Sequence, residues 1–338
     1  MERNADISRA IRSAYDELIN DRAFCDAMPN KLKKGLFIDP FISSAKAQKV
    51  ASFIHQYCGT SDDKIISISD IFCQKLYAIC CVSAKLLTEG GIIKFDPNNN
   101  LVIGGHYHIE EESFKKIVAE SGKYLKEQRE IFKKGESDFS EKIIKEIDEC
   151  ANQYINSELN YLSTALFTSS AIKMLILHEY FHIINNDKES APLDVKITQE
   201  KKADIDAFNR LKEKENNIAS YIGALCLQSS GLFLNDYLES LLHPDVDNRI
   251  EYIYNICDQE ENERNIFSDI LKLYVNLWAK INEKETDFLS ECDSPTPKDI
   301  FNFLKKEKEK QSSARLEEGR KEMMEQARRR VKPKYATD

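Results

Sequence analysis

The chain has 338 residues, of which 42% are apolar, and a formal net charge of −9 at pH 7. The length corresponds to about two domains, or to one large domain with appendages, and the apolar content excludes wholesale disorder. The acidic balance disfavours non-specific binding to nucleic-acid phosphates. The 11 glycines and 8 prolines, beside many Lys, Glu, Leu and Ile, predict a mostly helical protein.

Residues 1–160 are predicted to form a mostly helical N-terminal region. The chain opens with polar residues and no apolar leader, so we expect no secretory signal. Helical segments are expected up to about residue 60, and residues 64–87 carry apolar positions at helical spacing, with Ser69-Asp70 as a cap. Residues 91–104 hold two short β-like runs around an Asp-Pro-Asn-Asn-Asn turn, which predicts a β-hairpin.

Residues 161–293 are predicted to form the core that carries the chemistry. The most apolar helix candidate covers residues 169–186, and a second helix is expected from Thr198 to about Lys214. Apolar runs in this region stay shorter than the roughly 18 residues that a membrane helix needs. The nine cysteines form no C-x-x-C pair, so we expect neither a zinc ribbon nor a thioredoxin-type site. These features together favour a reduced, soluble, cytoplasmic protein.

Residues 298–338 are predicted to be a charged tail, helical or disordered. A Ser-Pro-Thr-Pro segment precedes the tail, and residues 304–338 contain 12 Lys and Arg against 7 Asp and Glu. A basic run of this kind is usually solvent-exposed, and contact with RNA or ribosomes is the functional alternative.

One motif in the core carries recognisable chemistry. Residues 178–182 read His-Glu-Tyr-Phe-His, which matches H-E-x-x-H in a helix-forming context. Residues i and i+4 share one helix face, so His178 and His182 can bind the same metal ion. Glu179 would lie beside the open coordination position and take a proton from water. The structural alternative is a buried apolar helix whose histidines form hydrogen bonds within the core.

A catalytic zinc site needs a third protein ligand. Residues 200–204 read Glu-Lys-Lys-Ala-Asp, and their first and last members lie one helical turn apart. Glu200 is the predicted third ligand, and Asp204 is predicted to accept the outer N–H of a ligand histidine. Asp194, Asp204 and Asp206 are the alternatives for the ligand position, and a solvated charged face is the structural alternative.

The order of these motifs resembles a known class of enzymes. H-E-x-x-H followed by E-x-x-A-D resembles the gluzincin metallopeptidases, whereas the glycine and third histidine of the metzincins do not follow His182. Residues 243–250, of the form H-P-x-x-x-x-R-I, resemble an element found downstream in several gluzincins. The nearest resemblance, over roughly residues 165–255, is to the Lit-like phage-exclusion peptidases. It implies a cytoplasmic zinc endopeptidase that cleaves a host translation factor during phage infection.

The downstream element allows two interpretations. Pro244 is excluded from a helix interior, so His243 is expected at a helix junction with a new helix starting near Asp245. In the structural interpretation, Arg249 pairs with a carboxylate such as Asp204 and holds this segment against the two helices that carry the predicted metal ligands. In the functional interpretation, His243 donates a hydrogen bond to the oxyanion of the tetrahedral intermediate.

The sequence therefore predicts a mainly α protein with a small β element, in which the H-E-x-x-H helix packs on the E-x-x-A-D helix. Zn²⁺ held by two histidines and a glutamate would activate water for peptide-bond hydrolysis. The hairpin at 91–104 is a candidate edge to which a peptide substrate could add as a strand. The alternative from another class is a non-catalytic zincin-scaffold protein that interacts with partners through its basic tail.

Overall fold

The computed structural model describes most of the chain from residue 52 onwards. The described residues are 52–56, 64–68, 70–98, 100–135, 141–187, 191–215, 218–234, 238, 245–256, 261–282 and 296–331. Within them, the strands are β1 (Ser52–Gln56), β2 (Lys64–Ile68), β3 (Ile93–Phe95) and β4 (Leu101–Ile103). The helices are α3 (Asp70–Glu89), α4 (Glu111–Gly135), α5 (Glu141–Tyr154), α6 (Glu158–Ile184), α7 (Leu193–Glu215), α8 (Ile218–Ser229), α9 (Gly231–Leu234), α10 (Val246–Ile256), α11 (Glu261–Ile281) and α13 (Pro297–Val331). The prediction of a mainly α fold with a small β element is confirmed.

The strands form two separate antiparallel hairpins, only one of which was expected. β3 pairs with β4, with Ile93 opposite Ile103, as the sequence predicted for 91–104. β1 pairs with β2, with Ser52 opposite Ile68, so the expectation of helix at 52–56 and 64–68 is wrong. Both strands are short: β1 contains Phe53 and Ile54, and β2 contains three isoleucines, residue types that favour a pleated strand. Helix and strand spacing are hard to separate in five residues. The helix that follows begins at Asp70.

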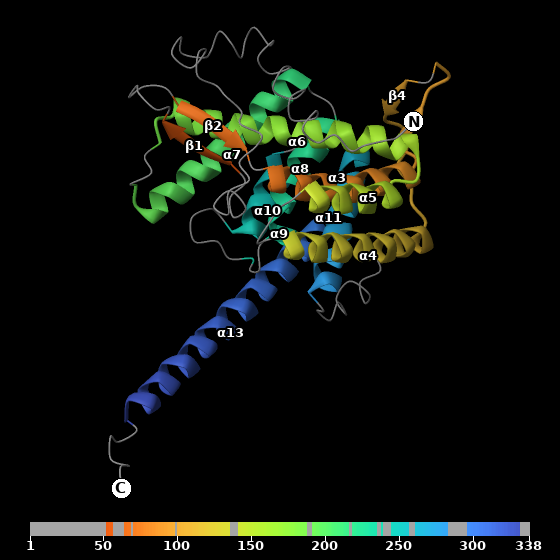
Figure 1. The fold of residues 1–338 in the computed structure, drawn as a ribbon. Helices are drawn as coiled ribbons and strands as arrows, with labels where there is room; N and C mark the ends of the chain where they lie inside the picture. The colour runs from red at the N-terminus through yellow and green to blue at the C-terminus, as the bar shows by residue number, and fades with distance from the viewer. Residues whose placement is uncertain are drawn as a thin grey trace.

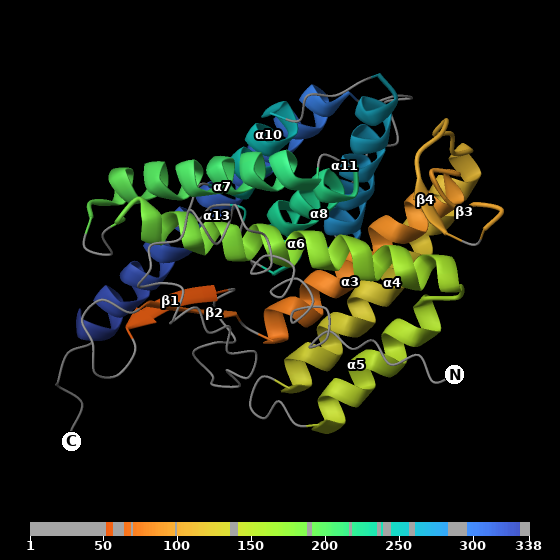
Figure 2. The ribbon, with the colours of Figure 1, turned by 90° about the horizontal axis from the view of Figure 1, so that it is seen from above.

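Helix α6 lies at the centre of the molecule and carries the H-E-x-x-H motif. It packs against α3, α7 and α8, and both hairpins contact it (Figures 1 and 2). Its apolar residues surround the helix instead of forming one stripe, as expected for a helix that is covered on several sides. It begins earlier than predicted, because the hydroxyl of Ser157 accepts a hydrogen bond from the Asn160 N–H and caps the helix at residue 158.

The two hairpins lie at opposite ends of α6. Both views place β1 and β2 beside the C-terminal half of α6, which contains the two histidines (Figures 1 and 2). β3 and β4 lie beside its N-terminal end, where α5 leads into the helix (Figure 2). The hairpin chosen from the sequence as a substrate edge is therefore remote from the motif.

Helix α7 begins five residues before the predicted cap. It starts at Leu193, directly after Pro192, so Thr198 lies inside the helix and its hydroxyl donates to the Asp194 carbonyl at 2.9 Å. α10 begins at Val246, as expected for a new helix near Asp245. It packs against α7 and α8 on one side and α13 on the other, which joins the C-terminal helix to the centre of the fold.

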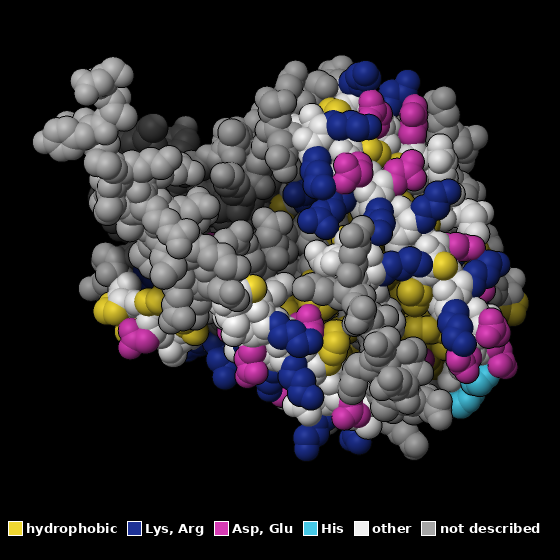
Figure 3. Space-filling model, turned by 90° about the horizontal axis from the view of Figure 1, so that it is seen from below, with side chains coloured by type: hydrophobic (Ala, Val, Ile, Leu, Met, Phe, Trp, Pro, Cys, Tyr) yellow, Lys and Arg dark blue, Asp and Glu magenta, His cyan; other side chains and the backbone are white. Residues whose placement is uncertain are grey.

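Helix α13 packs on the body only at its N-terminal end. Ile300, Phe301 and Leu304 are buried against the core, contacts with the body continue to Gln311, which accepts from the Leu238 N–H, and the rest of the helix extends away from the molecule (Figure 1). The predicted tail is thus helical as far as Val331. On the face shown in Figure 3, the described lysines and arginines are interspersed with aspartates and glutamates, without a large area of one sign. None of the described helices combines the length and hydropathy of a membrane span.

Candidate metal centre

Three predicted ligands meet between α6 and α7. The Nε2 atoms of His178 and His182 lie 3.0 Å apart. The two carboxylate oxygens of Glu200 lie 3.3 Å from His178 Nε2 and 3.4 Å from His182 Nε2. One ligand atom from each of the three residues falls within 4.8 Å of the others, so the group could hold a metal ion. Two imidazoles and one carboxylate are a ligand set typical of catalytic zinc, and the residues present therefore fit that ion.

The outer nitrogen of His178 faces a fully buried carboxylate. Its Nδ1 lies 2.9 Å from Oδ1 of Asp204, on the next turn of α7 after Glu200. Burial alone would lower the pKa of His178, but the carboxylates of Asp204 and Glu200 raise it to about 10. Without a metal ion, the imidazole of His178 is therefore readily protonated, and a metal ion that bound Nε2 would have to displace the proton from that nitrogen. Asp204 thus lies where the sequence predicted it, behind the first histidine.

The outer nitrogen of His182 has a carboxylate of its own, which the sequence did not reveal. Its Nδ1 lies 2.8 Å from Oδ2 of Asp187, five residues further along the chain. Asn186 adopts φ 54°, and the backbone N–H groups of Asn186 and Asp187 donate to the carbonyls of Ile183 and His182. This Schellman turn reverses the chain and returns the carboxylate to the last turn of α6. The sequence predicted the end of this helix near residue 186 but not the return of the Asp187 carboxylate to His182.

Asp204 is the centre of a second, buried cluster. Arg249 on α10 donates to both of its oxygens, from Nε at 2.9 Å and from Nη2 at 2.7 Å. Tyr252 OH donates to Oδ2, and Gln228 Nε2 donates to Oδ1 at 3.0 Å. Although burial would raise the pKa of Asp204, Arg249 and His178 hold it well below its ordinary value. Asp204 therefore stays ionised and can orient His178.

This cluster bears on the two interpretations of the downstream element. The contact between Arg249 and Asp204 that the structural interpretation expected is present. Tyr252 and Gln228 were not predicted, because neither belongs to a motif and both reach Asp204 only through the packing of α10 and α8. His243 and Pro244 lie outside the described residues, so the oxyanion role of His243 stays a prediction.

The other residues predicted for the site are Glu179 and the alternative carboxylate ligands of α7. Glu179 follows His178 on α6 and is half-buried. Of the alternative ligands, Asp194 is exposed in the first turn of α7, and Asp206 pairs with Lys202 at 2.8 Å. Glu200 is the carboxylate of α7 that lies against both Nε2 atoms, and Asp204 faces the outer nitrogen of His178 instead.

Comparison with known families adds independent support for a peptidase. Residues 107–269 match the family model Peptidase U49. The matched segment is just under half of the chain, and it contains both histidines, Glu200, Asp204 and Arg249. The match supports a peptidase family and a proteolytic role. Comparisons with curated proteins and with solved structures gave no significant match.

Proposed function

We propose that this protein is a zinc-dependent endopeptidase of the gluzincin type that hydrolyses a peptide bond in an intracellular protein. One observation carries the proposal: the Nε2 atoms of His178 and His182 and the carboxylate of Glu200 converge, while each outer histidine nitrogen lies against a carboxylate. Carboxylate–histidine–metal arrangements of this kind fix the tautomer and the ring orientation of metal ligands. Two histidines that served only to pack the core would not each need a carboxylate partner.

Each residue of the candidate site has a separate role in the proposed mechanism. His178, His182 and Glu200 would hold the ion, and Asp204 and Asp187 would keep the two imidazole rings in place. When bound, zinc supplies Lewis acidity to the substrate carbonyl and lowers the pKa of water. Glu179, half-buried beside His178, is the base that accepts the proton of the attacking water and passes it to the leaving amine.

The position of the hairpins bears on how a substrate would lie. A peptide can add as a strand to an exposed sheet edge, and β1–β2 is the hairpin beside the C-terminal half of α6 (Figure 2). We therefore assign strand addition to β1–β2 in place of residues 91–104. The resemblance to Lit-like peptidases extends the proposal to a substrate of the translation machinery and a role in phage exclusion.

The proposal is tested by comparing wild type with Glu179→Gln. The amide keeps the size of the side chain but cannot accept a proton, so zinc should remain bound while turnover falls by roughly 10²–10⁴-fold. The measurements are zinc content per chain and proteomic mapping of new protein termini in cells that express each form. Chelation should abolish cleavage by wild type, and added zinc should restore it.

Two outcomes would remove the proposal. Near-normal cleavage by Glu179→Gln would exclude Glu179 as the base and, with it, the zincin mechanism. A wild-type protein that binds no metal and generates no new termini would favour the non-catalytic scaffold, which acts through partner binding.

A further inference from the structure

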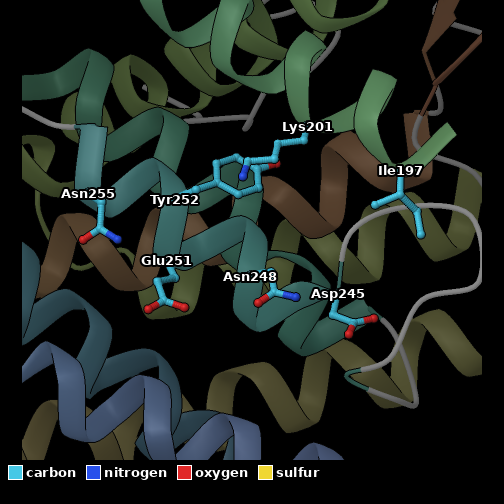
Figure 4. Close-up of a pocket in the computed structure, with 7 residues that line it drawn as sticks. All are labelled: Ile197, Lys201, Asp245, Asn248, Glu251, Tyr252 and Asn255. Atoms are coloured by element: carbon cyan, nitrogen blue, oxygen red, sulfur yellow. The ribbon is translucent and has the colours of Figure 1, made fainter. Parts of the chain in front are cut away.

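A polar pocket lies beside the metal centre, between α7 and α10. It has a volume of about 430 Å³. The lining residues are Ile197, Lys201, Asp245, Asn248, Glu251, Tyr252 and Asn255 (Figure 4). Lys201 directly follows Glu200 in the sequence, so one turn of α7 serves both the metal centre and the pocket. Tyr252 connects them a second time, because its ring lines the pocket while its hydroxyl donates to Asp204.

The charges that line the pocket differ in how far they are already paired. Asp245 lies 3.0 Å from Lys308 of α13, and Glu251 lies 2.9 Å from Lys305 of the same helix. Each acidic group therefore has a lysine partner outside the pocket, although Lys308 also donates to both carboxylate oxygens of Asp247. Lys201 has a different environment: its Nζ lies 5.6 Å from the centroid of the Tyr252 ring, and no described carboxylate lies within ion-pair distance.

Lys201 is consequently the charged residue of the pocket lining that has no ion-pair partner among the described residues. The exposed side chains of Asn248 and Asn255 add amide donors to the same wall of α10. A carboxylate that enters the pocket could accept from Lys201 Nζ and from an amide, and charge-assisted hydrogen bonds of this type are stronger than neutral ones. An incoming lysine or arginine would instead meet Lys201 with the same sign and two carboxylates that already hold partners.

We propose that the α7–α10 pocket binds an acidic side chain of the peptide substrate, and that Lys201 determines this specificity. The inference rests on the proposed function. Lys201, which lines the pocket, directly follows the proposed zinc ligand Glu200. The acidic residue of the substrate would therefore lie within a few positions of the bond that is cleaved. The substrate class is therefore a protein segment with Asp or Glu close to the scissile bond.

Cleavage profiling of wild type, Lys201→Glu and Lys201→Arg tests the inference. The probe is a library of peptides prepared from a digested proteome, incubated with zinc-loaded enzyme and sequenced for new termini. Wild type and Lys201→Arg should enrich Asp or Glu at one position near the cleavage site. Lys201→Glu should lose this enrichment and favour Lys or Arg there, and its kcat/KM for an acidic peptide should fall about tenfold or more.

Lys212→Glu is the matched control. It makes the same charge change on the same helix, 11 residues further on and thus about 16 Å along the axis, and should leave the profile unchanged. Zinc content is measured for every variant, because residue 201 adjoins a ligand. The inference is overturned if wild type shows no acidic preference, or if Lys201→Glu keeps the wild-type profile with full zinc.

A binding measurement separates this inference from the proteolytic function itself. Short randomised peptides are selected on immobilised Glu179→Gln protein and on Glu179→Gln combined with Lys201→Glu. Acidic peptides should be selected only by the first protein, whether or not wild type cleaves them. Selection without cleavage would refute the peptidase proposal and retain the pocket, whereas cleavage without acidic selection would do the reverse.

Discussion

Arg249 and Asp204 are 45 residues apart in the sequence and meet through two parallel hydrogen bonds, at 2.9 Å and 2.7 Å. Asp204 is fully buried and also lies 2.9 Å from His178 Nδ1. The guanidinium therefore does more than pair a surface charge: it stabilises the ionised carboxylate that faces the outer nitrogen of His178, a proposed metal ligand. This contact joins α10 to the candidate metal centre, so a residue of the candidate site also contributes to the packing of the fold.

The first prediction concerns the loss of this guanidinium. Arg249→Ala should lower the free energy of unfolding by roughly 3–5 kcal/mol, because it leaves the buried Asp204 charge without its main partner. Arg210→Ala is the control, since Arg210 pairs with the exposed Glu213 at 3.2 Å and should cost less than about 1 kcal/mol. Denaturant unfolding of both variants with chelator present excludes the contribution of bound metal. Equal losses in the two variants would contradict the central role of the Arg249 pair.

The second prediction separates the ligand from its support. Glu200→Ala removes one of three ligands, so zinc should be lost on dialysis. Asp204→Asn keeps the shape of the side chain but not its charge, and should weaken zinc binding by about 10–100-fold without abolishing it. Zinc content and zinc affinity, measured by competition with a chelating dye, check both statements. Stoichiometric zinc in Glu200→Ala would place the third ligand elsewhere.

The third prediction concerns Asp187, which only the structure revealed. Asp187→Ala should weaken zinc binding by about 10–100-fold, because Nδ1 of His182 loses the carboxylate 2.8 Å away. Asp206→Ala is the control: it removes a carboxylate that pairs with Lys202 and should leave zinc affinity unchanged. Asn186→Gly should also keep full affinity, since glycine accepts the positive φ at that position. An unaltered zinc affinity in Asp187→Ala would show that His182 needs no such partner.

The contrast between these residues shows what the sequence could predict. Helical spacing placed His178 with His182, and Glu200 with Asp204, on one face of their helices, and the H-E-x-x-H motif with its need for a third ligand brought the two pairs together. Asp187 lies five residues from His182 and approaches it only because the chain reverses through a left-handed residue. The spacing of apolar and polar residues does not predict that turn.

Other contacts depend on tertiary packing. Tyr252 reaches Asp204 across 48 residues and Gln228 across 24, so neither contact could be inferred without knowing how α8 and α10 pack on α7. The β1–β2 hairpin was missed for a local reason. In residues 64–68, three isoleucines fit helix and strand spacing alike, and the pairing with 52–56 decides between them.

The fourth prediction concerns the close contact between α8 and α6, the helix that carries the H-E-x-x-H motif. Gly223 of α8 faces α6 so closely that an added Cβ would lie 2.6 Å from Ser170 Cβ and 2.8 Å from the backbone nitrogen of Ala171. These atoms belong to the interior of α6 and cannot move without moving the helix. Gly223→Ala should therefore destabilise the fold by about 1–3 kcal/mol through overpacking, despite the better helix propensity of alanine. Ser170 lies two turns before His178, so the displaced helix should also weaken zinc binding.

Gly122→Ala is the matched control for this prediction. Gly122 is likewise buried within a helix, α4, but the three atoms nearest to its added Cβ all belong to the flexible side chain of Lys280, with Cδ 2.9 Å away. A lysine side chain can rotate aside, so the gain in helix propensity, up to about 1 kcal/mol, should offset the contact. Thermal unfolding should thus give a lower Tm for Gly223→Ala and an unchanged or higher Tm for Gly122→Ala. A Gly223→Ala protein as stable as wild type would mean that α6 and α8 lie further apart than the structure places them.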